Sequence, residues 1–237
     1  MNIFGAHITV RIAIPALAVG IAIAGVGFVI INQVQRAAVE KQAVKTAESV
    51  VAQMLATRAV YTKDVVSKLQ TDGVNIEFGP DFREKQRHVP LPATMVHLIS
   101  DEVNKQGLYT IDLISPWAIN PAKQPAAGWE RNSTDALIID PKSPKSEIDT
   151  SGGKSKLLYM AADFASTPAC VQCHNNLPDS PKKDYELGDM MGSLVVTIPL
   201  TEEFSSARNQ SVYIALGNIG VIAVLAVLLV FLWRRIA

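Results

Sequence analysis

Two long apolar segments lie near the ends of the chain and enclose a longer segment of mixed polarity. Ile12 to Ile31 contains no charged residue, and Val212 to Trp233 is the second such run. Each run has about twenty residues, which is enough for a helix to cross the hydrocarbon core of a bilayer. We therefore predict transmembrane helices over residues 12–32 and 212–233.

Basic residues flank both apolar runs. Arg11 precedes the first run, and a pair of arginines follows the second. Because cytoplasmic flanks carry an excess of Lys and Arg, we predict cytoplasmic ends at residues 1–11 and 234–237. Residues 33–211 are then expected on the outer side of a bacterial inner membrane, in the periplasm.

The first apolar run could also belong to a signal peptide. A cleaved signal peptide is the alternative to a membrane anchor. The run is long for such a peptide and no Ala-x-Ala site follows Ile31, which favours a retained anchor.

The first apolar run also carries small residues at regular spacing. Ala16, Gly20 and Ala24 recur every four residues and form a stripe that would admit close approach of another helix.

The segment between the runs begins with an amphipathic helical pattern. Residues 33–70 contain neither Gly nor Pro, and Val44, Ala47 and Val51 recur at three- and four-residue steps. The sequence Thr71-Asp72-Gly73 is typical of a helix end. We predict one long helix, continuous with the first membrane helix.

The remainder of this segment predicts a mixed α+β domain. Pro92 is well placed as the first-turn residue of a helix to Lys105, ended by Gly107. Residues 136–139 fit a short helix or a strand, and residues 140–156, rich in Pro, Ser, Lys and Gly, predict an exposed mobile loop. Strands are predicted over residues 108–115, 156–164 and 192–200, and a helix start at Thr201 leads into the second membrane helix.

The pentapeptide from Cys170 to His174, Cys-Val-Gln-Cys-His, is the attachment signature of a c-type haem. Two intervening residues set both thiols at the reach of the vinyl groups of one porphyrin. His174 is then held under the ring, where its imidazole binds the iron as proximal ligand. The chain has no cysteine besides Cys170 and Cys173. The motif predicts one covalent haem c in the turn after the strand at residues 156–164.

Redox dithiols and zinc sites also use Cys-x-x-Cys. A usual zinc site needs a second Cys/His pair of suitable spacing, which the chain lacks, and a dithiol does not need the histidine. Haem attachment requires a location outside the cytoplasm, in agreement with the predicted topology. Haem is therefore the favoured interpretation.

Charge and motifs exclude several other classes of function. The formal net charge is zero, which argues against a nucleic-acid-binding protein that depends on phosphate contacts. The sequence has no Walker loop, no Gly-rich dinucleotide fingerprint and no HExxH pattern. No acid–base constellation supports catalysis on a small substrate, so we expect that the protein is not an enzyme.

Two segments resemble the haem-binding PAS-like domain of bacterial chemoreceptors, histidine kinases, nucleotide cyclases and small stand-alone cytochromes. The first holds Val89-Pro90-Leu91-Pro92-Ala93-Thr94, Asp112 to Trp117 and Asn120-Pro121; the second holds Leu158-Tyr159, Cys170 to Asn175, Ser180-Pro181-Lys182, Asp184-Tyr185, Gly188-Asp189 and Gly192. The resemblance implies a PAS-like antiparallel sheet flanked by helices, with a long N-terminal helix and one covalent haem. The expected fold class is therefore α+β, with this domain between two transmembrane helices.

The sixth iron ligand decides what a haem does, because Met or His closes the site for electron transfer and an open position admits gas. The resemblance implies a ligand from the long N-terminal helix, where Met54 is the only Met or His in residues 33–70. Core packing explains Met54 equally well. His97 is the alternative ligand, although a histidine on such an apolar face is more often a packed residue.

Aromatic residues supply the surface that a porphyrin pocket needs. Tyr61, Trp117 and Tyr159 are the candidates, with core packing as the alternative explanation.

Two functions compete at this stage. Family members known as sensors continue past the second membrane helix into signalling modules, whereas only residues 234–237 follow it here. This favours an electron-transfer or redox-active cytochrome subunit, with other membrane-complex subunits or a second copy and a redox protein as partners. The alternative is a redox or gas sensor that signals through its membrane helices to a separate protein.

Overall fold

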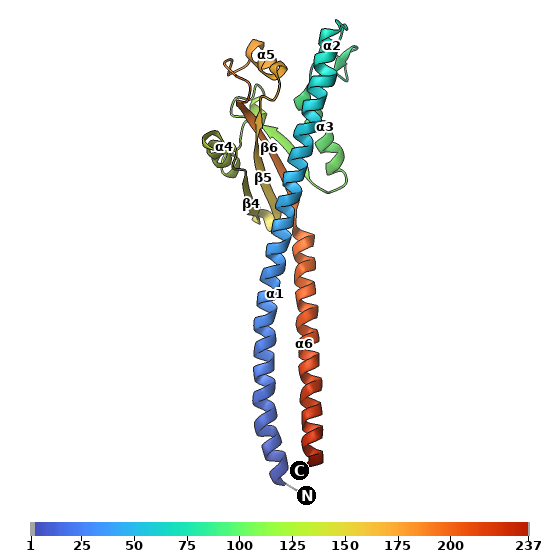
Figure 1. Cartoon of the computed structure of the whole chain (residues 1–237), viewed down its shortest axis with the longest axis vertical. Helices are drawn as coiled ribbons and strands as arrows, with labels where there is room; N and C mark the ends of the chain where they lie inside the picture. The colour runs from blue at the N-terminus through green and yellow to red at the C-terminus, as the bar shows by residue number, and fades with distance from the viewer. Residues whose placement is uncertain (1–2, 237) are drawn as a thin grey trace. The chain divides into compact units, whose positions relative to one another are not determined.

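The computed structural model describes residues 3–236 (Figure 1). Residues 1–2 of the predicted cytoplasmic N-terminus and Ala237 of the predicted tail lie outside the described residues, as do the side chains of Arg11 and Arg234. The chain divides into two compact units, one of Met1–Lys41 with Thr201–Ala237 and one of Gln42–Leu200.

The first unit pairs the start of α1 (Ile3–Val60) with α6 (Thr201–Ile236). Among the described residues, these two helices are long and apolar enough to cross a membrane. A Cβ atom at Gly20 would lie 2.8 Å from Cγ2 of Ile222, so the small-residue stripe of α1 meets α6 of the same chain. The fully buried Ser211 donates a hydrogen bond to Gln35 (2.8 Å). Both helices are compatible with membrane anchoring.

The second unit is built on a four-stranded antiparallel sheet with strand order β3-β6-β5-β4. The central strands are buried on both faces, which explains their nearly continuous apolar sequences. Predicted strands at all three positions are confirmed, with the last one beginning at Met190. The strand bounds are Thr110–Ile114 for β3, Lys145–Asp149 for β4, Lys156–Phe164 for β5 and Met190–Pro199 for β6.

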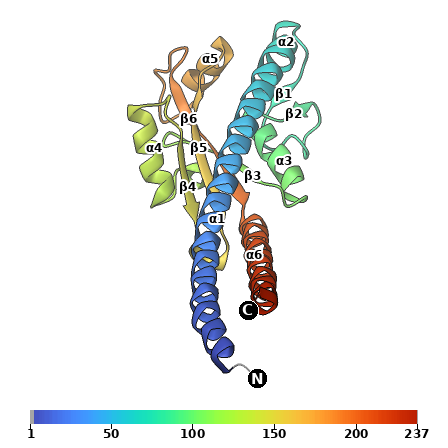
Figure 2. The same cartoon turned by 60° about the horizontal axis from the view of Figure 1, so that its bottom comes forward.

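Helices cover this sheet on both faces. On one face α4 (Trp129–Ile139) buries Leu137 against Met160 and Val195. On the other face, the part of α1 after Gln42 lies against the sheet, and α3 (Pro92–Asn104) packs beside β3 (Figure 2). The expected α+β class with a long N-terminal helix is thus confirmed.

The long predicted helix is interrupted at its end. After Val60 the chain forms one π-helical segment, η1 (Tyr61–Val66), then the short α2 (Ser67–Thr71), and it ends before Gly73 at φ 65°. The remaining short elements are β1 (Glu77–Phe78) paired in parallel with β2 (His88–Val89), η2 (Pro121–Lys123) and η3 (Ser151–Gly153).

Two predictions for this unit are wrong. Residues 140–156 do not form a mobile loop, because β4 pairs with β5 along its whole length and Asp149 accepts a hydrogen bond from the backbone of Ser151 (2.7 Å). The Cys-x-x-Cys-His motif lies on a helix, α5 (Pro168–Asn176), and not in a turn. Pro168 at the first helical position sets the backbone for this helix start.

Candidate cofactor site

The first turns of α5 present two free thiols. Cys170 and Cys173 are three residues apart, so they lie on neighbouring positions of one helix face. Cys170 packs against a buried cluster that contains Ala165 and Tyr185, and its Sγ lies 3.2 Å from the hydroxyl of Thr167. Cys173 is exposed.

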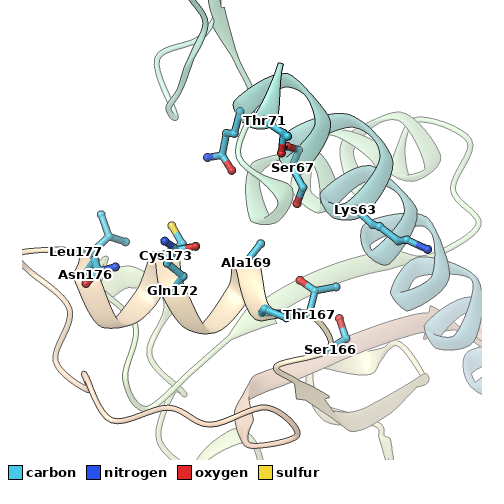
Figure 3. A pocket seen from close by; sticks show the side chains of 12 residues that line it. Lys63, Ser67, Thr71, Ser166, Thr167, Ala169, Gln172, Cys173, Asn176 and Leu177 are labelled. Carbon is cyan, nitrogen blue, oxygen red and sulfur yellow. The ribbon is translucent and has the colours of Figure 1, made fainter. Parts of the chain in front are cut away.

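A cavity of about 970 Å³ lies between α5 and the end of the long N-terminal helix (Figure 3). One wall is polar and comes from η1 and α2, with Lys63 and Ser67 among its residues. The other wall comes from α5 and the segment before it, and includes Thr167 and Cys173. The volume is at the upper end of the range of about 300–1,000 Å³ for cofactor sites. The cavity is therefore large enough for a cofactor, and Cys173 lines it, whereas Cys170 and His174 are not among its lining residues.

His174 lies half-buried next to the thiols. Its ring meets the ring of Tyr185 edge to face, with centroids 5.9 Å apart and planes at 85°. Burial and the positive charge of Arg58 lower the pKa of His174 below its ordinary 6.5, and the carboxylate of Asp163 offsets part of this effect. The imidazole is thus neutral near pH 7, which is the form that binds iron.

Arg58 and Asp163 form a buried ion pair near His174. The two guanidinium nitrogens lie 2.7 and 2.6 Å from the two carboxylate oxygens, and the side chains are 11% and 5% exposed. Sequence reasoning missed both residues. A signal existed, because Arg58 follows Met54 by one helical turn on the apolar face, and Asp163 directly follows the apolar run from Leu157 to Ala162.

Tyr185 is a second residue that sequence reasoning missed as part of the site. Its backbone is held by Asn175, which donates to the Tyr185 carbonyl (2.9 Å) and accepts from its N–H (3.0 Å). Burial, together with the carboxylates of Asp184 and Asp189, raises the pKa of Tyr185 to about 12. The phenol therefore stays neutral beside the imidazole of the motif.

The three predicted aromatic residues occupy different places. Trp117 meets Tyr185 edge to face at 6.3 Å and so belongs to the surroundings of the motif. Tyr61 begins the π-helical segment and donates a hydrogen bond to the carbonyl of Pro90 (2.7 Å). Tyr159 is 4% exposed in the middle of the sheet, opposite Val196, and its role there is core packing.

The two candidate sixth ligands both lie apart from the cavity walls. Met54 is 6% exposed on α1, one turn before Arg58. His97 lies on α3 with its Nδ1 3.5 Å from Asp112, a carboxylate that also pairs with Lys123. Burial and Lys123 lower the pKa of His97, and Asp112 opposes them.

Comparison with known proteins gives one family and one solved structure. No curated protein matches the chain. A crystal structure described as that of the cyanobacterial haem protein Tll0287 is 15% identical, covers 67% of this chain and 95% of its own, and has a TM-score of 0.45. The model of the Tll0287-like family matches residues 35–199, which is more than half of the chain. The chain therefore belongs to the Tll0287-like family.

Proposed function

We propose that this protein is a membrane-anchored c-type cytochrome with one covalent haem, which carries electrons as a subunit of a larger membrane complex. The observation that carries the proposal is the position of the Cys-x-x-Cys-His motif on a helix that borders a cofactor-sized cavity, with a neutral His174 beside the thiols. The description of Tll0287 itself as a haem protein agrees with this assignment.

The residues of the motif have distinct roles in this proposal. Cys170 and Cys173 hold the porphyrin through thioether bonds, and His174 is the proximal iron ligand. The bound haem supplies a one-electron couple. Tyr185 packs edge to face against the ring of His174, and Trp117 packs edge to face against Tyr185.

The proposed location follows from the apolar helices and the flanking arginines. Both ends of the chain lie in the cytoplasm, and residues 33–211 lie in the periplasm, where c-type haem is attached. The partners are other subunits of the membrane complex or a second copy, and a protein that donates or accepts the electron.

Removal of the thiols tests the haem assignment. Cys170→Ala and Cys173→Ala are each expected to weaken covalent haem retention, and the double variant to abolish it, because no other cysteine remains. Haem staining on a denaturing gel measures this, with His88→Ala on β2 as a control that leaves attachment unchanged. Full staining of the double variant would refute the assignment.

A haem-based sensor is the second candidate function. It is favoured by α1, which runs as one helix from the apolar segment to Val60 and continues into the π-helical wall of the cavity.

The occupancy of the sixth iron position distinguishes electron transfer from sensing. We propose Met54 for this position, and then Met54→Ala opens the site, so that carbon monoxide binds faster to the ferrous form. A low-spin spectrum of the unmodified protein that is unmoved by carbon monoxide supports electron transfer, and ready binding supports the sensor. If Met54→Ala changes neither the spectrum nor the rate, the ligand assignment moves to His97.

A further inference from the structure

The ion pair of Arg58 and Asp163 joins the long N-terminal helix to the end of β5. The contact is bidentate, with both N···O distances below 2.8 Å, and links residues that are far apart in sequence. Asp163 precedes Ala165 by two residues, and Ala165 packs against Cys170 in the cluster below the motif. The pair therefore lies at the end of β5, just before α5, the helix that carries the Cys-x-x-Cys-His motif.

Stability alone is a poor explanation for this pair. Desolvation of two charges offsets most of their attraction, and replacement of such a pair by apolar residues of similar volume is often neutral or stabilising. Loss of one partner is different, because it leaves an uncompensated buried charge. The two side chains are 11% and 5% exposed, so water screens that charge little.

The charges of this pair reach the proposed iron ligand. Both Arg58 and Asp163 act electrostatically on the imidazole of His174, with opposite signs. A positive charge near an iron centre favours the ferrous form, which carries less positive charge, and a negative charge favours the ferric form. In an intact pair the two effects oppose each other, and that of Arg58 is the larger.

We propose that Arg58 and Asp163 are a positioning pair that holds α1 against the end of β5, just before α5, and sets the reduction potential of the haem through opposed charges. This inference rests on the proposed function. The pair acts on the iron through His174 and its surroundings, without contact with the reacting atoms.

Reduction potentials of charge-removing variants test the proposal in the full-length protein in mild detergent. Asp163→Asn leaves Arg58 unpaired, so the potential rises relative to the wild type. Arg58→Gln leaves the carboxylate unpaired, so the potential falls. The double variant, with neither charge, returns toward the wild-type value. Redox titration followed by haem absorbance measures all three.

Opposite shifts distinguish this role from a purely structural one. A structural role predicts shifts of the same sign in both single variants, because each loosens the same contact. Glu102→Gln is the matched control: it removes one carboxylate from an exposed pair with Lys105 on α3 and leaves the potential unchanged. Urea unfolding followed by circular dichroism reports the accompanying loss of stability in the two single variants.

The outcomes separate this inference from the proposed function. Shifts of equal sign, or no shift, in variants that retain haem overturn the inference. A wild-type protein without covalent haem overturns the proposed function instead. If one single variant does not fold, the sign of the shift in the other decides: Asp163→Asn must raise the potential, or Arg58→Gln must lower it, and a shift of the opposite sign or no shift refutes the inference.

Discussion

At the scale of single residues, His174 obtains its environment from distant parts of the chain. Tyr185 approaches it from the loop before β6, while the charges of Arg58 and Asp163 come from α1 and β5. Burial and Arg58 lower the pKa of His174, Asp163 opposes them, and Tyr185 packs edge to face against the ring. The adjacent sequence supplies only the thiols.

Protonation of His97 destabilises the folded protein, so the contribution of this histidine to stability decreases as the pH falls. Its folded pKa lies below 6.5, mainly because of burial and then Lys123. Between that lowered pKa and 6.5 the unfolded chain binds more protons, so stability is fully present above about pH 6.5 and is lost as the pH falls through this window.

His97→Gln is therefore expected to flatten the loss of stability on acidification. Urea unfolding of both proteins at several pH values from about 7.5 to 5 measures the difference between them. The wild type should lose stability relative to the variant as the pH falls. Parallel curves would show that His97 does not titrate in this range.

At the scale of elements, the approach of β6 to β3 depends on one glycine. A Cβ atom at Gly192 would lie 2.6 Å from the backbone carbonyl oxygen of Ile114. The neighbouring Ser115 hydroxyl donates to the carbonyl of Met191 (2.7 Å), so this region has no room to adjust. The register of β6 brings Gly192 opposite Asp163.

Gly192→Ala is expected to destabilise the fold by about 1–3 kcal/mol, as overpacking of a tight contact does. The adjacent Ser193→Ala is the matched control. The hydroxyl of Ser193 is buried without a hydrogen-bond partner among the described residues, so its removal is neutral or stabilising. Urea unfolding compares the two, and equal effects would contradict the predicted contact.

At the scale of the whole molecule, the two apolar helices and the arginines beside them predict the topology. The unit at Gln42–Leu200 is expected on the periplasmic side, with both ends in the cytoplasm. The opposite orientation would place the thiols in the cytoplasm, where c-type haem is not attached.

Labelling of single cysteines tests this topology in a Cys170→Ala/Cys173→Ala background. Lys154→Cys is exposed and should react with a membrane-impermeant maleimide once the outer membrane is permeabilised. Arg235→Cys should react only after the inner membrane is broken. Labelling of Arg235→Cys in intact spheroplasts would overturn the predicted orientation.

Hydrophobic periodicity and local motifs were sufficient for most elements and for the Cys-x-x-Cys-His part of the candidate site. The strands of the central sheet and the helix from Pro92 carry their own patterns. The strand β4 carries none, because it is an edge strand of polar composition that forms through pairing with β5. The π-helical segment Tyr61–Val66 likewise has no distinct pattern in the sequence.

The sequence by itself determined the two apolar helices, the α+β class and the Cys170-x-x-Cys173-His174 motif, because each depends on residues that are neighbours along the chain. Only the tertiary structure decided which distant residues surround the motif. Arg58, Asp163 and Tyr185 meet around His174 through the packing of α1 and the loop before β6 against the sheet. Local sequence carries no information on such contacts, because they arise from the burial of apolar faces over long separations in the chain.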